Sequence, residues 1–216
     1  MIRALSILLS ISLLVWSSFI LWGAYQNANT HNKLFQFHPP LMAFGFMVFM
    51  TGGLLSVVNK KSQLMHVSFQ LIGAICILTG LLVVVLAKTR SGESHFNSTH
   101  SVIGLTAVLG LVYQIINGML KLCNNNGGFV KSHGLSGLGI YLLGVCALLI
   151  ACSSYLCGNI TIPKAPGTYE CDSPEINSIR FSITLILPAI LVVLLYIKHA
   201  KVRIHRYPNP NVYTTF

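Results

Sequence analysis

The chain has 216 residues, of which 54% are hydrophobic and only 8% are Asp, Glu, Lys or Arg. Soluble domains carry about 25% charged residues, so this composition excludes an ordinary soluble globule and a disordered protein. The formal net charge of +10 does not indicate a nucleic-acid partner, because a chain with so few charges has no soluble basic face to offer. The composition predicts a polytopic protein embedded in a lipid bilayer.

Six apolar segments are long enough to cross a membrane. A hydrocarbon core of about 30 Å takes about 20 helical residues, and backbone groups in lipid must be satisfied within the segment, which favours helices. The predicted spans are residues 4–24, 38–58, 64–87, 99–120, 134–156 and 179–197. We therefore predict an all-α fold and one domain over residues 1–216, with six transmembrane helices and a basic cytosolic tail at 199–216.

The first span is interpreted as a membrane anchor rather than a cleaved signal peptide. An apolar run of about 20 residues is long for a signal peptide, and Trp16 and Trp22 suit a membrane interface. Most Lys and Arg residues then lie on the side that holds both termini. Because basic residues favour the cytosolic side, both termini are predicted to be cytosolic.

Features of the opposite side agree with this orientation. All four acidic residues fall there, as do two N-x-S/T sequons at Asn97 and Asn159, which are candidate N-glycosylation sites. Cys157 and Cys171 fall in the last outer connection, where an oxidising compartment could join them as a disulfide. Asn97 is close to the membrane, which disfavours its glycosylation.

Four histidines lie at the amino-terminal ends of consecutive spans: His38, His66, His100 and His133. Ionisable residues inside a membrane are costly, so each is a candidate functional residue. Spans two and four enter from outside, which places His38 and His100 at one outer level. Spans three and five enter from the cytosol, which places His66 and His133 at one inner level.

The spacing of the glycines supports a functional role for these histidines. Gly45 and Gly52 follow His38 at intervals of seven and fourteen residues, and Gly73 and Gly80 follow His66 at the same intervals. In an α-helix such intervals keep residues on one face. We interpret the missing side chains as room for a flat ring between helices, although helix packing through small residues is the alternative.

Two histidines at one level on different helices can hold a metal from both sides, and imidazole is a common axial ligand of haem iron. Zinc is disfavoured, because it takes a closed tetrahedral set at one place. The pattern therefore predicts two haems with two axial histidines each, which favours electron transfer over ligand chemistry. Gln114, fourteen residues after His100, is expected near the inner pair.

The sequence resembles the cytochrome b561 family, most closely its short, domain-containing type. The resemblance covers spans two to five closely and rests on four motifs: Phe35-Gln36-Phe37-His38-Pro39 with Met42, His66 with Gln70, the stretch from His95 to Ser101 with Gly104, and His133 with Gly137. Val102 departs from the pattern, because many relatives carry Trp there.

This resemblance implies a four-helix core, spans two to five, holding two haems b per chain. The four histidines would be their axial ligands. It also implies that the protein takes electrons from cytosolic ascorbate and reduces monodehydroascorbate radical or a ferric chelate on the lumenal or extracellular side. Family members are often homodimers. The predicted location is a plasma membrane or an endomembrane, such as that of the ER, a vesicle, an endosome or a lysosome.

Substrate contacts are expected at both faces. Lys61 lies five residues before His66, where relatives carry a lysine that contacts ascorbate, and Lys60 and Lys131 are nearby cations of the same side. His95 and Arg90 precede span four and are candidates for the outer acceptor site. Two alternatives stay open: a quinol-linked cytochrome b subunit, and a membrane scaffold or transporter without haem.

Overall fold

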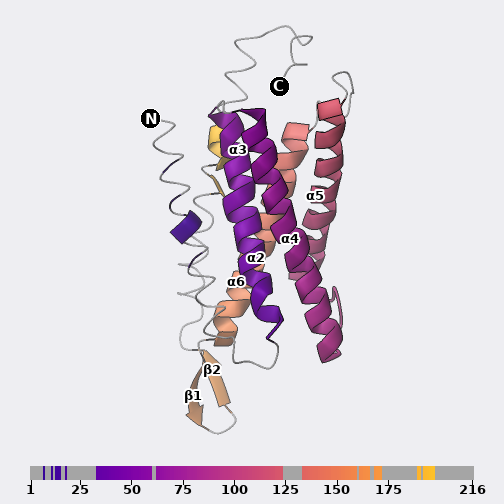
Figure 1. Cartoon of the computed structure of the whole chain (residues 1–216). Helices are drawn as coiled ribbons and strands as arrows, with labels where there is room; N and C mark the ends of the chain where they lie inside the picture. Colours follow the sequence, from indigo (N-terminus) through magenta and orange to yellow (C-terminus); the bar gives the residue numbers. More distant parts are fainter. Residues whose placement is uncertain are drawn as a thin grey trace.

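The computed structural model describes residues 33–59, 62–123, 133–159, 161–165, 168–171, 189–190 and 192–197, together with residues 7, 11, 13–15 and 18. For residues 121 and 152–159 and for both strands, only the backbone is described. The predicted helical fold class is confirmed: long helices lie side by side along one direction (Figure 1).

The second predicted span is built from four consecutive helical pieces that together run from Phe35 to Val58. A 3₁₀ turn, η1 (Phe35–Phe37), leads into α2 (His38–Ala43). The first turn of α2 contains Pro39 and Pro40, and proline is tolerated there because the first N–H groups of a helix have no partner within the helix. A π-helical segment, η2 (Phe44–Met50), follows, and α3 (Thr51–Val58) completes the span.

Three longer helices complete the described bundle: α4 (Gln63–Ser91), α5 (Thr99–Cys123) and α6 (His133–Asn159). The Ser62 side chain caps α4 by accepting a hydrogen bond from the Met65 N–H at 3.3 Å. Gly92, at φ 67°, ends this helix in the left-handed conformation that favours glycine. Helix α4 thus continues four residues beyond its predicted end at Ala87, up to that glycine.

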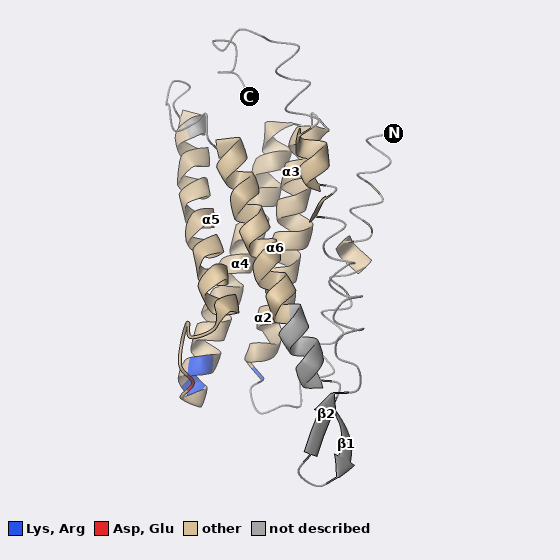
Figure 2. Cartoon of the chain, turned by 180° about the vertical axis from the view of Figure 1, so that it is seen from behind, with Lys and Arg blue, Asp and Glu red and all other residues tan. Residues whose placement is uncertain are grey.

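Four helices of the described part are long and apolar enough to cross a membrane: Phe35–Val58, Gln63–Ser91, Thr99–Leu120 and His133–Ala151. They correspond to predicted spans two to five. Figure 2 shows the helices free of charge along most of their length, with the coloured Lys, Arg, Asp and Glu gathered at one end. This distribution fits helices whose middle parts lie in hydrocarbon.

The four spans form two helical hairpins. Helix α4 packs chiefly against α2, η2 and α3, whereas α5 packs chiefly against α6. A buried hydrogen bond of 3.0 Å between the hydroxyls of Thr51 and Tyr141 joins the two hairpins. The described residues of the first and sixth predicted spans are helical, and Leu13 and Val192 pack into the shared core.

The connection after α6 contains a short antiparallel hairpin that the all-α prediction did not include. Strand β1 (Thr161–Ala165) pairs with β2 (Thr168–Cys171), with Thr161 opposite Cys171. This hairpin lies at the same end of the bundle as the connection between α4 and α5 (Figure 1). Such an addition leaves the helical core unchanged.

Candidate haem sites

The structure brings the four candidate histidines together in the two predicted pairs. His38, the first residue of α2, faces His100 in the first turn of α5, with ring centroids 6.3 Å apart and ring planes at 82°. His66 in α4 faces His133, the first residue of α6, with centroids 6.3 Å apart and planes at 83°. The antiparallel helices place one pair toward each end of the bundle.

The separation in each pair matches a single metal atom between the rings. A metal–nitrogen bond takes about 2 Å on each side, and the nitrogen lies about 1 Å from the ring centre, so two bound rings would be about 6 Å apart. Among the described residues, no three His, Cys, Asp or Glu side chains surround one point. Two protein ligands suffice for haem, whose ring supplies the other donors, but not for a structural zinc.

The orientation of the rings suits axial ligation. His38 Nδ1 lies 2.9 Å from the Gly80 carbonyl oxygen, His66 Nδ1 2.9 Å from that of Gly53, and His100 Nδ1 2.9 Å from that of Ala147. A carbonyl oxygen only accepts hydrogen bonds, so each Nδ1 carries its hydrogen and donates. Each Nε2, on the other side of the ring, therefore keeps a lone pair for a metal.

Each of these contacts runs within one hairpin, whereas each histidine pair runs between hairpins. His38 and His66 are held by carbonyls of α4 and α3, and His100 is held by a carbonyl of α6. A metal bound by either pair would therefore join α2–α4 to α5–α6.

The glycines that follow His38 and His66 serve packing, so the interpretation as space for a ring is wrong for them. A Cβ at Gly45 would lie 2.5 Å from Ile77 Cγ1 and 3.1 Å from the Gly73 carbonyl oxygen, and one at Gly52 would lie 2.8 Å from the Phe69 ring. The π-helical segment also has a different number of residues per turn from the α-helix that the prediction assumed, so residues seven and fourteen positions after His38 need not share its face. These glycines let α2, η2 and α3 approach α4.

Polar side chains of α5 lie beside the inner pair. The amide of Gln114, 7% exposed, lies 2.7 Å from His133 Nδ1. Asn117 is 3% exposed, and among the described residues its amide nitrogen has no hydrogen-bond partner. A Cβ at the next residue, Gly118, would lie 3.5 Å from the His133 ring.

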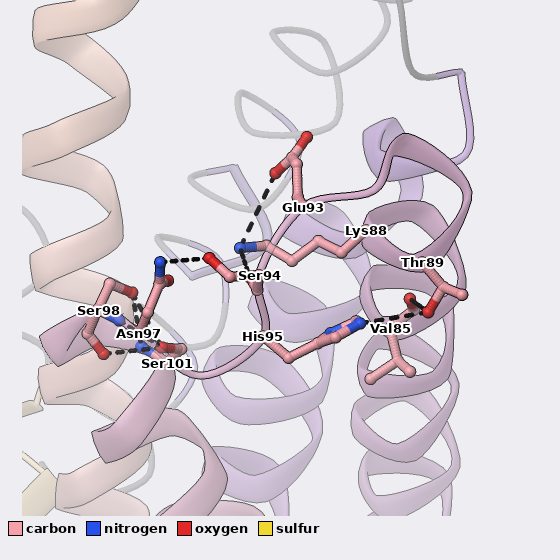
Figure 3. A network of polar contacts seen from close by, with 9 residues as sticks. All are labelled: Val85, Lys88, Thr89, Glu93, Ser94, His95, Asn97, Ser98 and Ser101. Atoms are coloured by element: carbon pink, nitrogen blue, oxygen red, sulfur yellow. Dashed lines mark hydrogen bonds and ion pairs between the residues drawn. The ribbon is translucent and has the colours of Figure 1, made fainter.

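The connection between α4 and α5 is held by its own polar contacts (Figure 3). Lys88 Nζ donates to the Ser94 carbonyl oxygen at 3.2 Å and pairs with Glu93 at 3.9 Å. Thr89 donates to the Val85 carbonyl oxygen at 2.9 Å, so the 3.2 Å contact between its hydroxyl and His95 Nε2 has the imidazole as donor.

The two acceptor candidates lie in the last turn of α4 (Arg90) and on the connection that follows this helix (His95). Both His95 and Arg90 are exposed. Nearby, the Asn97 side chain donates to the Ser94 hydroxyl at 2.6 Å (Figure 3), so the nitrogen that a glycan would occupy already makes a hydrogen bond within the connection.

Several predicted site residues fall outside this description. Lys60, Lys61 and Lys131 lie outside the described residues, and only the backbone of Cys157, Asn159 and Cys171 is described. The ascorbate contacts, the disulfide and the glycosylation at Asn159 therefore stay predictions.

Comparison with known proteins agrees with this geometry. The model of the eukaryotic cytochrome b561 family matches residues 37–158. The chain belongs to this family. It is therefore a transmembrane electron-transfer protein, an oxidoreductase, and haem b is the cofactor that membership implies. The matched range holds all four paired histidines.

Individual relatives cover a similar range. Transmembrane reductase CYB561D2 from Homo sapiens is 32% identical over 156 residues, which are 62% of this chain and 68% of the human protein. Transmembrane ascorbate ferrireductase 1 from Arabidopsis thaliana is 28% identical over 160 residues, 66% of this chain and 64% of the plant protein. Ascorbate-specific transmembrane electron transporter 2 from Zea mays is 25% identical over 157 residues, 66% of each chain.

The cytochrome b561 sites contain groups that side-chain patterns do not reveal. The carbonyls of Gly53, Gly80 and Ala147 orient three histidines, and a backbone carbonyl leaves no mark in the sequence. The contact of Gln114 with His133 does have a signal, since Gln114 is a polar residue in an apolar span, fourteen residues from His100.

Proposed function

We propose that the protein carries electrons across the membrane through two haems b, one between His38 and His100 and one between His66 and His133. The observation that carries this proposal is the repeated geometry, two pairs at 6.3 Å with nearly perpendicular rings, one toward each end of the bundle. When bound, haem iron accepts and releases one electron at a time. With both axial positions taken by histidine, electron transfer is favoured over binding of a further ligand.

The proposed donor is cytosolic ascorbate and the proposed acceptor is monodehydroascorbate radical or a ferric chelate. The names of the Arabidopsis and maize relatives support ascorbate as the donor. The distribution of basic residues supports a cytosolic position for both termini and for the inner pair. His95 and Arg90, exposed beside the outer end of α4, are the proposed acceptor contacts.

A visible absorption spectrum of the purified protein, with haem per chain quantified, tests this function. We expect two haems b per chain and their reduction on addition of ascorbate. Two haems that ascorbate leaves oxidised would favour the quinol-linked alternative. A protein without haem would favour a scaffold or transporter and would contradict the proposal.

Replacing Lys61 by Ala should slow reduction by ascorbate without loss of haem. A hydrogen bond to a charged group contributes about 1.5–3 kcal/mol, so ascorbate should bind at least about tenfold more weakly. The rate of haem reduction is measured in sealed vesicles with ascorbate at the cytosolic face. Lys33→Ala, at a lysine of the predicted outer side, is the control. Equal reduction rates in the Lys61→Ala and wild-type proteins would remove Lys61 from the donor site.

A further inference from the structure

Gln114 of α5 joins the first turn of α6 through both ends of its amide group. One terminal atom of the amide lies 2.7 Å from His133 Nδ1 and 3.2 Å from the His133 carbonyl oxygen. The other lies 2.5 Å from the Ser136 hydroxyl and 3.0 Å from the Gly137 backbone nitrogen. The side chain is buried, so these contacts are not open to exchange with water.

The two orientations of this amide require opposite tautomers of His133, and the one with its nitrogen toward the ring satisfies all four contacts. With its nitrogen toward the ring, Gln114 donates to Nδ1, so the ring hydrogen lies on Nε2 and blocks a bond to iron. With its oxygen toward the ring, Gln114 accepts a hydrogen bond from Nδ1, and Nε2 keeps its lone pair. Only the second orientation serves a ligand.

The second orientation also closes a consistent chain of hydrogen bonds. Nδ1–H of His133 donates to Gln114 Oε1, and Gln114 Nε2 donates to Ser136 Oγ at 2.5 Å. The Ser136 hydroxyl in turn donates to the His133 carbonyl oxygen at 3.5 Å. The same orientation leaves Gln114 Oε1 3.2 Å from the His133 carbonyl oxygen and Nε2 3.0 Å from the Gly137 nitrogen, two contacts that only the first orientation turns into hydrogen bonds. The need of a metal for the Nε2 lone pair of His133 is therefore what selects the second orientation.

The other three paired histidines share one pattern of hydrogen bonding, and Gln114 supplies the corresponding acceptor for His133. Each donates its Nδ1 hydrogen to an oxygen of the partner helix in its own hairpin. For His133 in α6 the partner helix is α5, and the oxygen that α5 offers is the Gln114 amide. We infer that Gln114 is the positioning residue of the inner haem: it holds His133 in the tautomer and orientation that leave Nε2 for the iron.

The acceptor at His133 can be changed by mutation, because it is a side chain, whereas the acceptors at the other three histidines are backbone carbonyls. An acceptor at Nδ1 makes the imidazole a stronger donor to the metal, which stabilises ferric over ferrous iron. Loss of the acceptor should raise the midpoint potential of the inner haem and weaken haem retention.

The test compares Gln114→Leu with Gln114→Glu, which keeps an oxygen at the same position. Gln114→Leu should release one haem to excess apomyoglobin about 10- to 100-fold faster than wild type, the usual effect of losing such a partner. One of its two midpoint potentials should rise, by about 59 mV for each tenfold change in the preference for ferric over ferrous iron. Gln114→Glu should restore haem retention and hold that potential at or below the wild-type value.

Tyr141→Phe is the matched control, because it removes one buried hydrogen bond, to Thr51, in the same bundle without touching a paired histidine. Its haem release and both potentials should equal those of wild type. Wild-type release and potentials in Gln114→Leu, or equal shifts in Tyr141→Phe, would overturn the inference. If Gln114→Leu fails to fold, Gln114→Glu decides, and a raised potential or fast haem release in that variant would overturn it.

The inference rests on the proposed haem function, and the same samples separate the two. A wild-type protein with fewer than two haems contradicts the proposed function. Two haems in wild type with potentials indifferent to Gln114 contradict only the role of Gln114.

Discussion

A His66→Ala protein should hold one haem per chain and lose reduction by cytosolic ascorbate, because the inner iron loses one of its two axial ligands. His100→Ala should also hold one haem, but the remaining inner haem should still accept electrons from ascorbate. Electron transfer across sealed vesicles should be lost in both variants. Haem content, the spectrum after ascorbate, and reduction of an acceptor enclosed in the vesicles measure these effects.

His95→Ala is the control for haem content, since His95 lies on the exposed α4–α5 connection and its Nε2 contacts Thr89 rather than a paired histidine. It should retain two haems. Acceptor turnover in the same variant tests the proposed contact with the acceptor. Two haems in both His66→Ala and His100→Ala would contradict the assignment of the pairs.

A Gly45→Val protein should be less stable by about 1–3 kcal/mol, the usual effect of overpacking, and should lose haem on mild heating. The new Cβ would lie 2.5 Å from Ile77 Cγ1 and 3.1 Å from the Gly73 carbonyl oxygen. The Ile77 side chain can move, but the backbone oxygen cannot, so η2 and α4 must separate. Their separation would draw the Gly80 and Gly53 carbonyls away from His38 and His66.

Gly139→Val supplies the comparison, because a Cβ at Gly139 meets nothing within 4 Å. Both changes place the same β-branched residue in a helix, so their intrinsic effects on helix formation are similar. The difference in thermal midpoint, followed by haem absorbance in detergent, isolates the packing effect. Equal midpoints would mean that the α2–α4 contact does not position the histidines.

Contacts within each hairpin orient the histidines, and contacts between the hairpins bring them into pairs. Each hairpin orients its own histidines through its own backbone or amide oxygens, and the histidine pairs then meet between the two hairpins, which share one packed core. Bound haem would add ligand bonds at both levels. Metal binding to residues from two elements is coupled to their assembly.

The sequence by itself determined the membrane setting, spans two to five, and the membership of each histidine pair. Long apolar runs have one stable form in lipid, the helix, and alternating directions of entry place His38 level with His100, and His66 level with His133. These properties depend on neighbours in the chain.

The tertiary structure alone decided what surrounds the histidines. The glycines after His38 and His66 let α2, η2 and α3 pack against α4 rather than leave space for a ring. The π-helical segment changes which residues of span two share one helical face. The oxygens that orient the rings belong to residues 13 to 47 positions away. Such contacts arise from the approach of two helices, which no local pattern specifies. The sequence showed Gln114 only as a polar residue in span four near the level of the inner pair, and not its contact with His133.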